Sequence, residues 1–361
     1  MISESQPIIY REFKAAVDYV DVLQLERIAF GTETLSWMVP WLEQNPIGNS
    51  LMVVATCNQK IVGFLIVLPE QMCGFGKQHK CGYVMLAMTH PEYRRKGVYT
   101  KMSAYAFNLA YEQGFDFCLG YTVRKDALRA ELKMGWHLAD HIPILLFPLD
   151  LERRIKSIWI KNSIMSFILL SVERCLLQIA KKKSKNILKR STHDIKMVSS
   201  FSSEYNHLAE IAVKERQVSL FRTSQLLNWR YSSNQGSGRK YIIVEGRKGS
   251  DLKGALVLRR KELLGFDSVV LLDILTDGVE TSVLKELYAW VLINLISPSK
   301  PDLVGCMISK NRWEYRVLRR LGFLRSFKDY KMLLYPLRES LMSEYIDGRN
   351  WLSLWGNSDL V

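Results

Sequence analysis

The chain has 361 residues, of which 48% are hydrophobic, 24% charged and 11% aromatic. This length exceeds one typical compact domain, and the apolar content suffices for two cores, so wholesale disorder is excluded. The formal charge of +14 would favour a nucleic acid or an anionic membrane if it were evenly spread. Residues 1–150, however, carry 14 Lys and Arg against 15 Asp and Glu, whereas residues 151–200 carry 12 against 3. The positive charge belongs mainly to a connector, and we expect no nucleic-acid partner.

Residues 1–150 alternate short β-like runs with helical patterns, as expected when helices cover a sheet. Two β-branched runs on either side of a short polar break predict a hairpin of Leu51–Thr56 and Ile61–Leu68. Further strands are expected at Ile8–Phe13, Tyr83–Met88, Phe115–Thr122 and Ile142–Leu149, and helices at Asp18–Phe30, Thr34–Glu43, Val98–Gln113 and Asp126–Met134.

The segment Glu152–Lys183 has helical periodicity and leads into the basic run KKKSKNILKR. The first interpretation is an amphipathic connector docked on one domain, and the alternative is a helix resting on an anionic membrane surface. Its longest uncharged stretch, Asn162–Val172, is too short to span a bilayer. Without an export signal after Met1 or a CxxC pair among six cysteines, the sequence predicts a cytoplasmic protein without a metal site. Peripheral contact with the inner membrane is the alternative location.

A similar order of elements recurs after residue 190. At the end of the two halves, LKMGWHLADHIPILLFPL (Leu132–Leu149) resembles LRRLGFLRSFKDYKMLLYPL (Leu318–Leu337). Such self-similarity indicates a tandem duplication. We therefore predict a first domain at 1–150, a basic connector at 151–190 and a second, related domain at 191–361.

The loop THPEYRRKG, which follows a strand and opens a helix, is a candidate anion site. Glycine permits close approach of the backbone, and free N–H groups at a helix N-terminus favour a phosphate or diphosphate. From these residues alone, an ordinary basic helix start is an equally good interpretation. The candidate ligands are Arg94, Arg95, Lys96, Gly97, Val98, Tyr99 and Thr100.

The same loop resembles the phosphate-binding segment of the GNAT superfamily of N-acyltransferases. That pattern is Arg or Gln, two residues, Gly, one residue, then Gly or Ala; Arg94 and Gly97 match it, and Tyr99 departs from it. The resemblance implies an α/β (α+β) protein of two tandem GNAT-like domains, each with a mixed, mostly antiparallel sheet flanked by helices. It further implies acyl-CoA as the acyl donor and direct attack by an amine, without an acyl-enzyme. Backbone groups of Leu86, Ala87 and Met88 would then meet the pantetheine arm.

The catalytic groups are less obvious from the sequence. One helix in the family usually carries an Asn and, seven residues later, a Tyr that can protonate the leaving thiolate, where this chain has Arg124 and Glu131. Tyr121 is our candidate acid, and His90 and Asp273 are candidate bases. The alternatives are a packed aromatic for Tyr121, a turn residue for His90 and a buried partner of an Arg or a backbone N–H for Asp273.

The second half has acidic residues in TDGVETSVLKEL where the first has its basic loop, so we expect it to bind the amine rather than coenzyme A. In FRTSQLLNWRY, charge and stacking surface suggest a nucleotide-diphosphate ligand; the alternative is a helix that plugs the domain with Trp229. This motif and the tail WLSLWGNSDLV resemble bacterial proteins of surface-polysaccharide synthesis, including N-acyltransferases of dTDP-linked 3-amino-3,6-dideoxyhexoses. The substrate-binding candidates are Arg222, Trp229, Arg230 and Tyr231.

The predicted function is thus acyl transfer from acyl-CoA to an amino sugar, linked to a nucleotide, for lipopolysaccharide or O-antigen synthesis. One rival is acylation of another amine, such as an aminoglycoside, a polyamine or a lysine. A second is addition of amino acids from aminoacyl-tRNA, which the near-neutral first half disfavours. A third is a GNAT-fold binding protein without catalysis.

Overall fold

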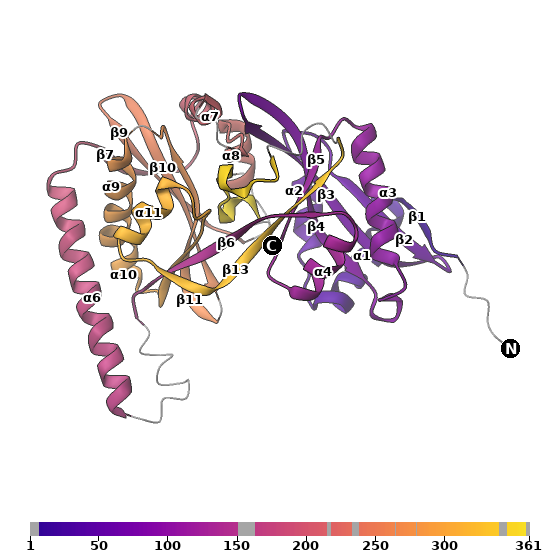
Figure 1. The fold of residues 1–361 in the computed structure, drawn as a ribbon, viewed down its shortest axis with the longest axis horizontal. Coiled ribbons are helices and arrows are strands. Elements are labelled where there is room, and N and C mark those ends of the chain that lie inside the picture. Colours follow the sequence, from indigo (N-terminus) through magenta and orange to yellow (C-terminus); the bar gives the residue numbers. More distant parts are fainter. Residues whose placement is uncertain are drawn as a thin grey trace.

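The computed structural model describes residues 7–150, 163–214, 218–232, 238–263, 265–278, 280–338 and 345–358. It is a mixed α/β structure in which helices flank one large sheet (Figure 1). The strands are β1 Ile9–Glu12, β2 Leu51–Cys57, β3 Lys60–Gly74, β4 Lys77–Thr89, β5 Phe117–Thr122, β6 His137–Pro148, β7 Asp194–Val198, β8 Ser219–Leu220, β9 Tyr241–Lys248, β10 Asp251–Leu263, β11 Phe266–Thr276, β12 Leu303–Met307 and β13 Leu324–Pro336. The helices are α1 Ala15–Phe30, α2 Leu35–Leu42, α3 Val98–Glu112, α4 Lys125–Lys133, α6 Ser163–Lys189, α7 Glu204–Lys214, α8 Ser224–Tyr231, α9 Thr281–Val291, α10 Ser297–Ser299 and α11 Trp313–Arg320, with shorter turns at η1 Pro91–Tyr93, η2 Leu292–Ile296, η4 Gly348–Asn350 and η5 Trp355–Asn357.

The sheet runs in the order β1-β2-β3-β4-β5-β13-β6-β12-β11-β10-β9-β7, and β8 pairs with β3. In each half, an antiparallel series ends in a parallel pair: β2, β3 and β4 are followed by β5, and β9, β10 and β11 by β12. The predicted hairpin of β2 and β3 is confirmed. The repeated order agrees with two related halves, as the sequence repeat predicts.

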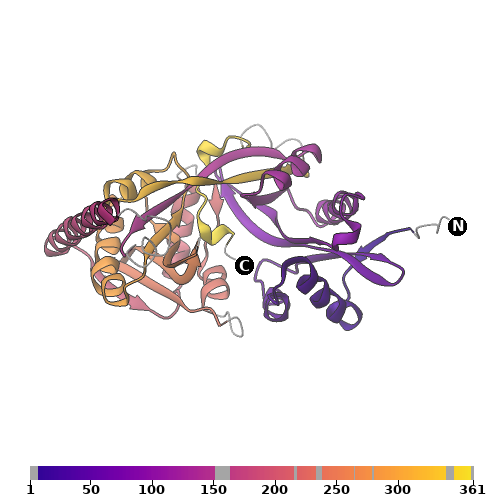
Figure 2. The ribbon, with the colours of Figure 1, turned by 90° about the horizontal axis from the view of Figure 1, so that it is seen from below.

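The last strands of the two halves are exchanged. β6, from the first half, pairs with β12, and β13, from the second half, lies between β5 and β6. Figure 2 shows these two strands running side by side between the halves. The edge of β5 is therefore completed by the second half. The division of the chain at residues 150 and 190 stays a prediction, and the sheet continues across it.

Among the residues that the structure describes, three apolar clusters stabilise this arrangement. One lies between the first half of the sheet and α3, and a second lies under α9 in the other half. The third cluster joins residues of α1, α2 and α8 with residues of the C-terminal segment such as Trp351. Because that central cluster draws on both halves, burial of apolar surface holds them together.

Several element boundaries differ from those predicted. β3 continues to Gly74 and β4 already begins at Lys77, because the two strands pair as far as these two residues. The last strand of the first half begins at His137 rather than Ile142, because β13 offers it a partner as far as the pair of His137 and Leu334. Helix α1 begins at Ala15 rather than Asp18, because the Asp18 carboxylate lies in the first turn and accepts a hydrogen bond from the backbone N–H of Lys14 at 2.7 Å.

Helix α6 forms the later part of the predicted connector, whose residues 151–162 lie outside the described part of the chain. It packs through Leu177, Ala180 and Ile187 against the core that contains α9. Its N-terminal end extends past the rest of the molecule (Figure 1). Within the part of the chain that the structure describes, no helix combines the length and the apolarity that a bilayer crossing needs.

Candidate functional site

Strands β4 and β5 diverge at the centre of the first half. Their parallel pairing includes Cys81 with Phe117 and Gly82 with Cys118, and it ends at Tyr83 with Leu119. β4 nevertheless continues to Thr89, while β5 continues to Thr122. Past the last pair, the facing edges of the two strands leave backbone N–H and C=O groups for another partner, and an extended ligand can supply it.

A β-bulge bends β4 along this opening. Phe64 of β3 pairs with Met88 and Ile66 with Met85, so Leu86 and Ala87 both lie opposite one residue. Within this bulge Leu86 has a positive φ of 49°, which is uncommon for a residue with a side chain. Ala87 is exposed, Leu86 half-buried and Met88 buried. The three residues predicted to meet pantetheine thus lie at a distorted strand segment, and Ala87 presents its surface to solvent.

The predicted anion loop links this strand to α3. Gly97 is the N-cap of α3 with φ 77°, and Arg95 also has a positive φ, 64°. No atom lies within 4 Å of the place where a Cβ on Gly97 would stand. The side chains of Arg94, Arg95 and Lys96 are exposed around this turn. Open space, cations and the first N–H groups of α3, at Val98, Tyr99 and Thr100, together suit a diphosphate.

Tyr99 leans from the first turn of α3 toward α4. Its hydroxyl lies beside Glu131 of α4, and burial raises its pKa above the ordinary value. Burial also raises the pKa of Glu131 to about 7, and the Tyr99 hydroxyl opposes that shift. Glu131 is therefore a half-buried carboxyl next to the loop rather than the solvated helix residue that its sequence position favours.

Tyr121 lies near the end of β5, at the diverging edge. Its ring is 6.0 Å from that of Tyr83, and its hydroxyl contacts two residues of the C-terminal segment. The hydroxyl is 3.3 Å from Ser353 Oγ and accepts a hydrogen bond from Asn357 Nδ2 at 3.4 Å. Burial raises the pKa of Tyr121 to about 12, whereas Ser353, Asn357 and the charge of Arg222 oppose the shift. The phenol is thus neutral near pH 7 and can act as a proton donor.

Asp273 lies behind Tyr121, in β11. One carboxylate oxygen accepts a hydrogen bond from Arg222 Nε at 2.8 Å, and the other accepts one from the Tyr231 hydroxyl. Arg222 Nη2 in turn donates to Asn357 Oδ1 at 2.8 Å. Asp273 is 1% exposed, so it holds these two side chains rather than facing an opening. The alternative noted from the sequence, a buried partner of an Arg, describes what the structure shows.

The other two substrate-binding candidates join the halves directly. Arg230 donates to the carboxylate of Glu70 in β3 and to the carbonyl of Gly356. Trp229 stacks on Trp41 of α2 with ring centroids 4.2 Å apart, and each indole N–H donates to the backbone carbonyl of the other tryptophan at 3.0 Å. Both side chains are buried. Their role in substrate binding stays a prediction, while their contacts hold α8 against the first half.

His90, the remaining catalytic candidate, lies apart from this network. It follows β4 and lines a surface groove of about 370 Å³ with Asp21 of α1, Lys60 and Glu92. Its Nδ1 accepts a hydrogen bond from the backbone N–H of Glu92 at 3.4 Å. The structure therefore brings Tyr121, Arg222, Tyr231 and Asp273 together and leaves His90 on another surface.

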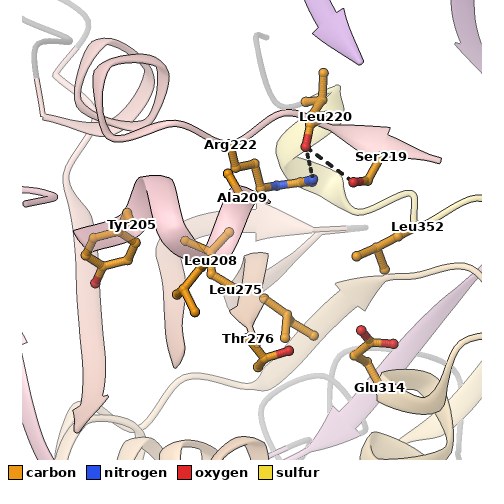
Figure 3. Close-up of a pocket in the computed structure, with 11 residues that line it drawn as sticks. Tyr205, Leu208, Ala209, Ser219, Leu220, Arg222, Leu275, Thr276, Glu314 and Leu352 are labelled. Atoms are coloured by element: carbon orange, nitrogen blue, oxygen red, sulfur yellow. Dashed lines mark hydrogen bonds between the residues drawn. The ribbon is translucent and has the colours of Figure 1, made fainter. Parts of the chain in front are cut away.

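The equivalent opening in the second half is filled by the chain itself. The pairing of β11 with β12 ends at Leu271 and Cys306, and Leu354 of the C-terminal segment then bridges to Ile308. What remains is a cavity of about 40 Å³ beside Arg222 and Glu314 (Figure 3). Such a space holds water molecules but not a coenzyme. That the second half binds the amine rather than coenzyme A stays a prediction.

Sequence reasoning missed the C-terminal residues Ser353, Gly356 and Asn357. The tail motif was noted only as a likeness, because nothing in its spacing shows that it folds back between the halves. Gly356 was the available signal: a Cβ there would overlap the Tyr231 hydroxyl and the Asp273 carboxylate. A glycine in an aromatic tail can thus mark close backbone approach.

Residues 10–138 match the model of the acetyltransferase (GNAT) domain family. No curated protein matches the sequence significantly. The matched segment contains the loop, so this part of the chain is similar to an acetyltransferase domain of the GNAT type. The match agrees with the expected enzyme class, an acyl-CoA-dependent N-acyltransferase.

Solved structures resemble the fold across 92% of this chain. A GCN5-related N-acetyltransferase from Anabaena variabilis has a TM-score of 0.60 and 13% sequence identity, and the match covers 73% of its chain. A tandem GNAT protein from the clavulanic acid biosynthesis pathway has a TM-score of 0.57 and 13% sequence identity, and the match covers 99% of its chain. Saccharomyces cerevisiae N-myristoyltransferase with bound myristoyl-CoA has a TM-score of 0.60 and 10% sequence identity, and the match covers 84% of its chain. At such identities the likeness concerns the fold, and it confirms the predicted fold class of tandem GNAT domains.

Proposed function

We propose that the protein transfers an acyl group from acyl-CoA to an amine, with the acyl donor bound between β4 and β5. The observation that carries this proposal is the continuity of the diverging strand edges with the open turn at Gly97. An extended pantetheine arm would hydrogen-bond to the edge near Ala87, while its diphosphate meets the α3 N-terminus and the cations of the loop.

The reaction needs an unprotonated amine, a placed thioester and a proton for the leaving sulfur. The amine nitrogen forms a bond to the acyl carbon, the carbon–sulfur bond breaks, and the sulfur takes the proton of the Tyr121 hydroxyl. The acylated nitrogen releases one proton to solvent, from which Tyr121 is reprotonated, so charge and protons balance. Tyr121 suits the acid role because it lies near the end of β5 and its pKa of about 12 keeps it protonated.

For the acceptor, we propose an amino sugar, with a dTDP-linked 3-amino-3,6-dideoxyhexose of surface-polysaccharide synthesis as the specific candidate. The support is the likeness of the α8 motif and of the tail. Burial of Arg222, Trp229, Arg230 and Tyr231 means that these residues would shape the centre between the halves, not stack on an exposed nucleotide. Aminoglycosides, polyamines and lysines are the competing acceptors, and a binding protein without catalysis is the competing function.

The test is thiol release from acetyl-CoA and longer acyl-CoAs in the presence of each amine class. Release with dTDP-amino sugars alone supports the specific acceptor, and release with another class replaces it. If CoA binds with measurable affinity but no amine elicits release, the catalytic proposal fails and the binding-protein alternative stands. If CoA does not bind, the assignment of the Gly97 turn fails as well.

We also propose that α6 contacts an anionic membrane, in agreement with the alternative drawn from the sequence. α6 exposes the apolar side chains of Leu176 and Ile179, and its exposed cations include Lys182 and Lys185. Apolar contact combined with several cations is what an anionic lipid surface attracts.

Sedimentation with vesicles tests this contact. Lys182→Glu with Lys185→Glu should abolish binding to vesicles that contain anionic lipid. Lys101→Glu with Lys133→Glu changes the charge equally at exposed sites of the first half and should not. If the two double variants bind equally to these vesicles, α6 does not make the membrane contact.

A further inference from the structure

The side-chain amide of Asn357 has its orientation fixed by the residues around it. Its Oδ1 accepts a hydrogen bond from Arg222 Nη2 at 2.8 Å and another from the backbone N–H of Leu354 at 3.3 Å. Because both donors approach the oxygen, the amide nitrogen must point the other way, where it donates to the Tyr121 hydroxyl oxygen at 3.4 Å. Asn357 is 3% exposed, so water does not compete for these bonds.

Ser353 supplies a second contact to the same phenol. Its Oγ lies 3.3 Å from the Tyr121 oxygen and 3.2 Å from Met332 Sδ, and its backbone N–H donates to Ser309 Oγ at 2.9 Å. A serine hydroxyl has one proton and can rotate. When the phenol gives its proton to a leaving sulfur, the Ser353 hydroxyl can turn from Met332 toward the phenol oxygen. Two donors, one on Ser353 and one on Asn357, then face the developing negative charge.

Arg222 and Asp273 account for the rigidity of Asn357. This ion pair is buried, with Arg222 7% and Asp273 1% exposed. A buried ion pair adds little net stability compared with apolar side chains of similar size, so its value lies in fixing geometry. Here it aims one guanidinium nitrogen at Asn357 Oδ1. The pair thus acts on Tyr121 through Asn357, across the junction between the two halves.

We propose that Asn357, carried by the C-terminal segment of the second half, is a positioning residue that orients and polarises the Tyr121 hydroxyl for proton donation. The inference rests on the proposed function, in which Tyr121 protonates the leaving thiolate. It assigns the second half a part in the chemistry of the first. Burial is the main cause that raises the pKa of Tyr121, and the Asn357 hydrogen bond opposes that rise, so loss of the amide makes the phenol a weaker acid.

A double-mutant cycle on the full chain tests the coupling. Tyr121→Phe keeps the packed ring and removes the proton, and Asn357→Leu keeps the volume and removes the amide donor. We expect Tyr121→Phe to lower kcat about 100-fold and Asn357→Leu about tenfold, with KM for acyl-CoA unchanged in both. The double variant should be no slower than Tyr121→Phe alone, because Asn357 acts through that hydroxyl.

A second variant guards against loss of folding. Asn357→Asp keeps the shape and the contact with Arg222 but replaces the donor that faces Tyr121 with an acceptor, so kcat should again fall about tenfold or more in a variant that still unfolds cooperatively on heating. The positioning role is refuted if Asn357→Leu lowers kcat by the same factor in the Tyr121→Phe background as in the wild type. It is also refuted if neither Asn357 variant changes kcat. A wild-type protein without transfer to any amine, or an unaffected Tyr121→Phe variant, refutes the proposed chemistry instead.

Discussion

Substitution of Gly97 by glutamate separates cofactor binding from folding. No atom lies within 4 Å of the added Cβ, so the main cost to stability is the left-handed backbone, about 1–2 kcal/mol for a residue with a side chain. The new carboxylate would point into the space proposed for the diphosphate. At about 5 Å from two phosphate charges, repulsion amounts to roughly 1.7 kcal/mol in water-like surroundings and several times more near the protein. Affinity for CoA should therefore fall at least about 20-fold.

Gly114 provides a matched control at the other end of α3. Its φ is 80°, close to the 77° of Gly97, and a Cβ there also meets open space. Gly114→Glu should thus lose a similar amount of stability while its CoA affinity stays at the wild-type value. Titration calorimetry with CoA measures the affinities, and thermal unfolding without CoA measures the stabilities. Equal CoA affinity in the two variants would show that the diphosphate does not bind at Gly97.

Three further predictions follow from other parts of the structure. Gly356→Ala should destabilise the protein by about 1–3 kcal/mol in chemical unfolding, because a methyl group would overlap Tyr231 and Asp273, and a wild-type midpoint would contradict this packing. For Glu131, the folded-state pKa of about 7 lies above its ordinary value, so stability is lost as pH rises through 7; Glu131→Gln should be more stable than wild type above pH 7, and the advantage should vanish below pH 4.5. A fragment of residues 1–150 should fail to give a cooperative melt because β5 then lacks β13, and co-expression with residues 151–361 should restore it.

Much of the first half could be predicted from local patterns. Alternation of apolar residues and the polar break after Thr56 predict the pairing of β2 with β3 correctly, because a hairpin depends only on neighbouring chain segments. The turn at Arg94 to Gly97 was equally readable, since these residues lie next to one another and set a local backbone geometry. That this turn binds an anion stays a prediction. The β-bulge at Leu86 was not, because leucine does not reveal a positive φ and the bulge depends on register with β3.

The site between the halves shows where local information ends. From their chemistry, Arg222 and Trp229 are equally suited to bind a ligand and to make buried contacts between the two halves. The choice depends on Trp41, Asp273 and Asn357, which are distant in sequence. No local signal distinguishes a tryptophan that stacks on a nucleotide from one that stacks on another tryptophan, because both present the same surface.

The sequence by itself determined that the chain has two folded halves, that the order of their elements repeats and that a basic turn precedes α3. These depend on periodicity and on short-range backbone geometry, which a single chain segment carries. Only the tertiary structure decided that β6 and β13 exchange partners, that the tail fills the second opening and that Asn357 reaches Tyr121. Strand partners and buried polar contacts are settled by which surfaces meet in space, since a strand has the same alternation whichever neighbour it pairs with.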